Sequence, residues 1–119
     1  MIWIQIGSIV MLMGVVLGAF GAHGLKNVLS PEAKQIYQTA VLYHLIHGLA
    51  LVVTGLLKVM KPEITGTKPA AVLFFIGIVL FSGSLYLLSL TGIKKFGMIT
   101  PLGGLAFIVG WLMLALSAR

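Results

Sequence analysis

The chain of 119 residues contains no cysteine and only two acidic residues. Without cysteine it can form no disulfide, thiolate metal site, iron–sulfur cluster or cysteine nucleophile. The two acids, Glu32 and Glu63, lie outside the long apolar runs and in different loops of the predicted fold. We therefore do not expect catalysis by a pair of carboxylates.

Charge of either sign is scarce: 8% of the residues are charged and 60% are hydrophobic. The mean hydropathy is +1.15. About a quarter of the residues of a typical soluble domain are charged. A small domain also buries only about two-thirds of the surface that its unfolded chain exposes, so it could not hide this much apolar surface from water. The composition predicts that lipid surrounds the protein.

The few charges are mostly positive and give a net charge of +6. Every basic residue lies in or beside a predicted loop, which is typical of anchors that contact phospholipid headgroups. A nucleic-acid site would need them clustered on one face. We therefore expect membrane lipids as partners and no nucleic acid.

Apolar runs without a charged residue cover residues 3–22, about 41–57, 70–90 and 101–118. Each is close to the length of about 20 residues that a membrane span needs. Ser30 and Pro31 extend the second helix back to residue 31, because serine caps helices and proline suits the first helical position. Thr100 and Pro101 predict the same start for the last helix. The predicted fold is an all-α integral membrane four-helix bundle, a single transmembrane domain over residues 1–119 with helices at about 3–22, 31–57, 70–90 and 101–118.

The first run is not predicted to be a cleaved signal peptide, because no Lys or Arg precedes Lys26 and the run is longer than an ordinary signal core. An even number of spans places both termini on one side of the membrane. The count of basic residues gives no orientation, because four lie at each side: Lys26, Lys34, Lys94 and Lys95 against Lys58, Lys61, Lys68 and Arg119.

Small residues line one face of the first helix and one face of the last. The first face has Gly7, Gly14, Gly18 and Gly21, and the second has Gly103, Ala106 and Gly110. Small residues let helix backbones approach closely in lipid, where no hydrophobic force drives association. We interpret both faces as helix-packing surfaces that could also support self-association. A passage lined by backbone is the alternative.

Polar side chains of the second helix recur at spacings of three and four, so they share one stripe that includes His44, His47 and Thr54. A polar group facing hydrocarbon would lack a hydrogen-bond partner, so the stripe should face protein. The candidate polar site within the membrane consists of these histidines with neighbouring polar residues: His23, Tyr43, His44, His47, Ser82, Ser84 and Tyr86.

Histidine is the residue type here that could carry chemistry, because it binds metals and moves protons. His44 and His47 lie three apart and could reach one metal ion, one haem or one proton pathway, with His23 as a further candidate ligand. Alternatively the imidazoles are neutral and hydrogen-bonded to Tyr, Ser or backbone carbonyls. No carboxylate in the spans is available to orient a metal ligand, which favours the second interpretation.

Four motifs resemble a known family: Gly18-Ala-Phe-Gly-Ala-His-Gly-Leu25, Tyr43-His-Leu-Ile-His-Gly48, Phe81-Ser-Gly-Ser-Leu-Tyr86, and Thr100-Pro-Leu-Gly-Gly-Leu-Ala-Phe107 with Gly110-Trp111. They are similar to the small bacterial membrane family called domain of unknown function 423, or uncharacterised protein family 0382, which is related to eukaryotic transmembrane protein 256. The resemblance implies a multi-pass protein of the plasma membrane. It implies no reaction, substrate or catalytic residue.

The first functional hypothesis is therefore a non-enzymatic membrane protein without a cofactor, which self-associates and binds or passes a small solute or a lipid. The second is a metal- or haem-associated redox or assembly factor that uses the three histidines. The third is an accessory subunit of a larger membrane complex.

Overall fold

The computed structural model describes residues 1–118, which form four helical spans. The first two spans are α1 (Ile2–His23) and α2 (Pro31–Met60). The third, Thr67–Thr91, consists of α3 (Thr67–Gly77), a π-helical segment η1 (Ile78–Ser82) and α4 (Gly83–Thr91). A 3₁₀ turn, η2 (Lys94–Met98), leads into α5 (Thr100–Ser117). All four spans are long and apolar enough to cross a membrane, which confirms the predicted fold class.

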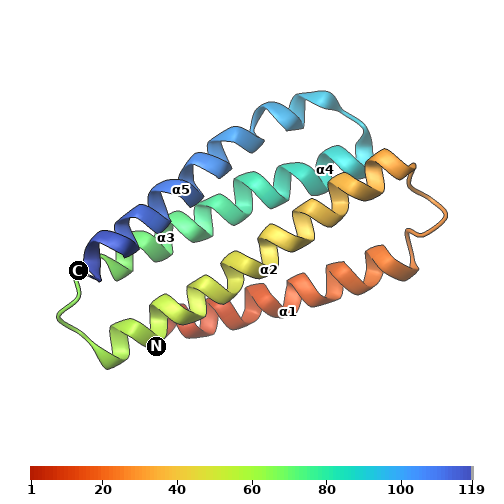
Figure 1. Ribbon diagram of the computed structural model, residues 1–119. Coiled ribbons are helices and arrows are strands. Elements are labelled where there is room, and N and C mark those ends of the chain that lie inside the picture. Colours follow the sequence, from red (N-terminus) through yellow and green to blue (C-terminus); the bar gives the residue numbers. More distant parts are fainter. Residues whose placement is uncertain (119) are drawn as a thin grey trace.

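The spans are arranged around α2 and the third span (Figure 1). Helix α2 packs against α1 on one side and against α3, η1 and α4 on the other, while α5 packs against α3 and η1. Accordingly 44% of the most apolar stretch of α2 is buried, against 17% for α1. The start of α1 and the end of α5 lie at the end of the bundle opposite the α1–α2 loop, as an even number of spans requires (Figure 1).

Local capping explains where α2 begins and ends. The Ser30 hydroxyl accepts a hydrogen bond from the Ala33 amide at 3.1 Å, and Pro31 follows as the first helical residue. The helix ends at Met60 rather than at Leu57. Its last turn tolerates Lys58, because the ammonium group leaves the apolar surface and donates to the Pro62 carbonyl at 2.9 Å.

The predicted threonine cap of the last helix is wrong. Ile99 is the N-cap residue of α5, without a side-chain hydrogen bond, and Thr100 already lies within the helix. The Thr100 hydroxyl instead contacts the Ser84 hydroxyl at 2.6 Å. A tertiary hydrogen bond has therefore replaced the local cap.

The glycine face of α1 is covered by α2. A Cβ atom on Gly7 would lie 2.7 Å from Val52 Cγ2, and one on Gly14 would lie 2.7 Å from Leu45 Cδ2. The face of α5 is covered in the same way, since a Cβ on Gly110 would lie 2.8 Å from Phe74 Cε1. Because these glycines have no side chain, side chains of the neighbouring helix can lie directly against their backbone.

This packing corrects one expectation. Both glycine faces are used within the chain, so they are not the free surfaces on which the expectation of self-association rested. Self-association stays a prediction, and its interface would have to lie elsewhere. Large apolar side chains on the outside of α1, including Leu12, Val16 and Phe20, remain exposed, as expected of a surface that faces lipid.

The π-helical segment in the third span is a feature that the apolar run did not predict. Phe74, Ile78, Ser82 and Tyr86 are spaced by four residues, and in a regular α-helix each such step turns the side chain about 40° away from its predecessor. The wider π turn between Ile78 and Ser82 absorbs this drift. Ser82 and Tyr86 consequently both reach α2, where they bond Ala40 and His44.

Candidate functional site

His44 lies in the middle of α2 and joins three helices. Its Nε2 is 2.8 Å from the Val10 carbonyl oxygen of α1, and its Nδ1 is 2.8 Å from the Tyr86 hydroxyl of α4. A carbonyl oxygen only accepts, so Nε2 carries the proton and donates to Val10. The Tyr86 hydroxyl then donates to the unprotonated Nδ1. The network thus assigns the Nε2–H tautomer to His44.

His47 has the opposite tautomer. Its Nδ1 lies 2.9 Å from the Tyr43 carbonyl oxygen and must donate to it, while its Nε2 accepts from the Trp111 indole N–H at 3.0 Å. The indole is only a donor, so Nε2 cannot carry a proton as long as this bond exists. The ring also stacks on Phe107, with centroids 3.5 Å apart and planes 9° from parallel. His47 is therefore held as a neutral imidazole between α2 and α5.

The histidines do not fit a shared metal or haem site. Every ring nitrogen of His44 and His47 is engaged by a protein group, so no lone pair is free to coordinate. His23, the third candidate ligand, lies exposed at the far end of α1. Within residues 1–118 no group of three or more His, Cys, Asp or Glu residues could hold a metal ion. The geometry matches the alternative in which the buried imidazoles are hydrogen-bonded structural groups.

The candidate serines also bridge helices. The Ser82 hydroxyl donates to the Ala40 carbonyl at 2.8 Å, which ties the third span to α2. The Ser84 hydroxyl of α4 donates to the Phe81 carbonyl of η1 at 2.9 Å and is hydrogen-bonded to the Thr100 hydroxyl of α5. Every buried side-chain nitrogen or oxygen in the described part of the chain has a hydrogen-bond partner. These serines are thus bonded to backbone and threonine, and neither contacts a histidine that could activate it.

Aromatic residues outside the predicted set complete this region. Phe74, Phe107 and Trp111 surround His47, and the ring of Tyr43 packs on Phe81 with centroids 4.6 Å apart. Sequence reasoning did not connect α5 to the histidines. A signal was present, because Phe107 and Trp111 lie four residues apart on one face of that helix and an indole N–H in a span needs an acceptor.

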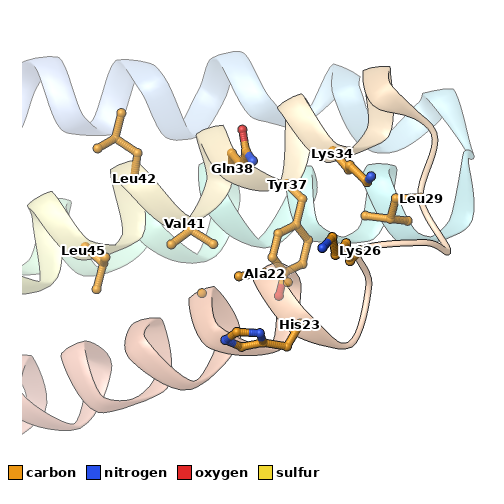
Figure 2. A pocket seen from close by; sticks show the side chains of 12 residues that line it. Ala22, His23, Lys26, Leu29, Lys34, Tyr37, Gln38, Val41, Leu42 and Leu45 are labelled. Carbon is orange, nitrogen blue, oxygen red and sulfur yellow. The ribbon is translucent and has the colours of Figure 1, made fainter.

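A groove with a volume of about 600 Å³ lies between α1 and α2. Small residues of α1 form one wall: Gly18, Gly21 and Ala22. One stripe of α2 forms the other: Lys34, Tyr37, Gln38, Val41, Leu42 and Leu45. The Tyr37 ring points from α2 across to α1, where its hydroxyl donates to the Leu17 carbonyl at 2.5 Å (Figure 2).

The two ends of this groove differ in chemistry. His23 is the last residue of α1, Lys26 lies in the loop that follows, and Lys34 lies in the first turns of α2, so all three belong to the loop end (Figure 2). Val41 and Leu45 lie further along α2, toward the middle of the span (Figure 2). The groove therefore runs from a basic mouth near the membrane surface into apolar surroundings. His23, predicted as part of a histidine site, instead belongs here, and the role of the two lysines was missed because they were interpreted only as general anchors.

Comparison with known proteins gives a consistent result. A model of the family described as "Protein of unknown function (DUF423)" matches residues 17–104. The "UPF0382 membrane protein YwdK" of Bacillus subtilis is 47% identical over 117 residues, which cover 98% of this chain and 95% of that protein. The "UPF0382 membrane protein SH2409" of Staphylococcus haemolyticus is 46% identical over 121 residues, covering 98% and 93%. None of these names states a reaction, and no solved structure matches the chain.

Proposed function

The chain belongs to the DUF423 family of membrane proteins, whose relatives carry the name UPF0382, and from this premise we propose that it is a non-enzymatic binding protein of the plasma membrane. Its ligand is an amphipathic membrane molecule that occupies the groove between α1 and α2. The observation that carries the proposal is the gradient in this groove from basic to apolar lining. Binding pockets of this kind combine a mostly apolar lining with a few polar groups that fix orientation.

Non-enzymatic action is supported by the state of the buried polar groups. An acid–base catalyst needs an ionisable group within hydrogen-bond reach of a substrate. The buried imidazoles face Val10, Tyr86, Tyr43 and Trp111 instead. The groove itself offers two lysines and one histidine but no carboxylate among its lining residues. These groups suit the binding of a ligand better than its conversion.

The experiment fills the groove from an exposed position. Ala22→Phe places a ring in the groove, whereas Ala19→Phe places the same ring on an exposed position of α1 that does not line it. Both proteins are purified in a mild detergent and examined by native mass spectrometry for bound lipids or other amphiphiles. We expect the wild type and Ala19→Phe to retain a bound molecule and Ala22→Phe to lose it. Equal retention by the two variants would contradict binding in the groove.

A further inference from the structure

We infer that the ligand of the groove is an anionic phospholipid, with its phosphate at the mouth and an acyl chain along α2. This inference rests on the proposed binding function and adds the chemical class of the ligand. Two lysines and one histidine line the loop end of the groove, namely Lys26, Lys34 and His23. The nearest acid in the sequence, Glu32, is not among the lining residues. The mouth is therefore a site for negative charge.

The order of side chains along α2 matches the order of groups in a phospholipid. Starting from Lys34, the amide of Gln38 follows about 6 Å further along the helix, and Val41 about 10 Å, at 1.5 Å per residue. A charge, a neutral hydrogen-bonding group and an apolar surface thus succeed one another. Phosphate, glycerol ester and hydrocarbon follow in the same sequence in a lipid.

The groove extends from the headgroup position into part of one lipid leaflet. From Lys34 to Leu45 the stripe extends about 16 Å along the helix axis. Half of a hydrocarbon core of about 30 Å is about 15 Å. An acyl chain whose headgroup lies at the mouth would lie beside Val41, Leu42 and Leu45, which extend about 6 Å along the helix axis, and would continue beyond the groove into its leaflet.

The basic mouth favours anionic over zwitterionic headgroups. A choline headgroup would add a positive charge next to Lys26 and Lys34, whereas a glycerol headgroup leaves the phosphate charge uncompensated. Each lysine near an anionic membrane surface strengthens binding by about fivefold, so the two together contribute about thirtyfold. Free phosphate would interact with the lysines alone and would make no contact with the apolar wall, so it should bind more weakly than a phospholipid.

The test uses the full chain in nanodiscs of phosphatidylcholine with one-fifth phosphatidylglycerol, released into native mass spectrometry. The wild type is compared with Lys26→Gln/Lys34→Gln and with a matched control, Lys94→Gln/Lys95→Gln. The control lysines lie in η2, at the same end of the bundle but outside the groove (Figure 1). We expect the wild type and the control to retain phosphatidylglycerol preferentially. The groove variant should lose this preference by about thirtyfold.

Four outcomes would overturn the inference. The wild type could retain the two lipids in proportion to their abundance while Ala22→Phe still releases both. The groove would then bind lipid without selecting a charged headgroup, and only the inference about the headgroup would be refuted. If the control loses its preference for phosphatidylglycerol as much as the groove variant does, the preference arises from the general positive charge near the membrane surface and not from the groove. If excess inorganic phosphate displaces the bound molecule completely, the acyl chain does not contribute. Absence of any retained lipid would contradict the proposed function as well.

Discussion

Removing one oxygen atom from Tyr86 is the sharpest test of the buried histidine network. The Tyr86 hydroxyl donates to His44 Nδ1 at 2.8 Å, and Tyr86→Phe keeps the ring and its edge contact with Tyr37. The loss leaves Nδ1 of a buried imidazole without a donor in hydrocarbon. Hydrogen bonds between membrane helices contribute about 0.6 kcal/mol on average and about 1.7 kcal/mol at most. We expect a loss of about 1.5 kcal/mol, near the upper limit, because His44 is buried and its partner cannot be replaced by water.

Tyr43→Phe is the matched control for this measurement. Tyr43 is also a tyrosine facing the third span, but 37% of its surface is exposed and its ring, rather than its hydroxyl, makes the contact with Phe81. Unfolding of both variants is followed by circular dichroism during titration with a denaturing detergent in mixed micelles. Tyr43→Phe should stay within about 0.5 kcal/mol of the wild type. Equal stability of the two variants would refute the role assigned to the Tyr86 hydroxyl.

Three further predictions follow from the contacts. In ¹⁵N NMR of the protein in micelles, His44 should show a protonated Nε2 and His47 a protonated Nδ1, and identical tautomers would contradict the assigned network. Trp111→Phe should destabilise the protein by about 1 kcal/mol in the same unfolding assay, because His47 Nε2 loses its donor. Gly7→Ala should cost about 1–3 kcal/mol, since its Cβ would lie 2.8 Å from a backbone nitrogen. Gly18→Ala should cost less, because its nearest neighbour is a valine methyl at 3.2 Å, and the reverse order would be inconsistent with the packing.

The sequence was sufficient to predict the number of spans and the helix faces that pack against other helices. Apolar length and the proline at position 31 determine local structure, and the three-four spacing of polar residues determines which face of α2 is turned to protein. It was not sufficient for the π turn at Ile78–Ser82. That turn adapts the third span to the four-residue spacing of its contacts with α2. A hydropathy pattern cannot reveal this spacing, because every residue involved is apolar, small or aromatic.

For the two histidines, the sequence predicted that they face protein but did not predict their hydrogen-bond partners. Their position three residues apart allowed a shared metal ion, whereas the lack of a carboxylate in the spans favoured separate hydrogen bonds to the protein. In the structure His44 turns toward α1 and α4, while His47 turns toward α5. The difference arises from the partners offered by other helices, a carbonyl oxygen at Val10 and an indole N–H at Trp111. No pattern within α2 contains that information.

The distribution of glycine in the α1–α2 pair explains why a groove exists at one end only. Toward the chain termini both helices contribute glycine: Gly7 of α1 meets Val52, and Gly55 of α2 comes so close to α1 that a Cβ there would lie 2.8 Å from the Ile4 amide nitrogen. Toward the loop α1 still has Gly18, but α2 has no glycine between Pro31 and Gly48. Large side chains of α2 therefore face small residues of α1 at that end. Gly18, Gly21 and Ala22 of α1 leave space beside these side chains near the loop, and Lys26 of the loop and Lys34 of α2 make that end of the space basic.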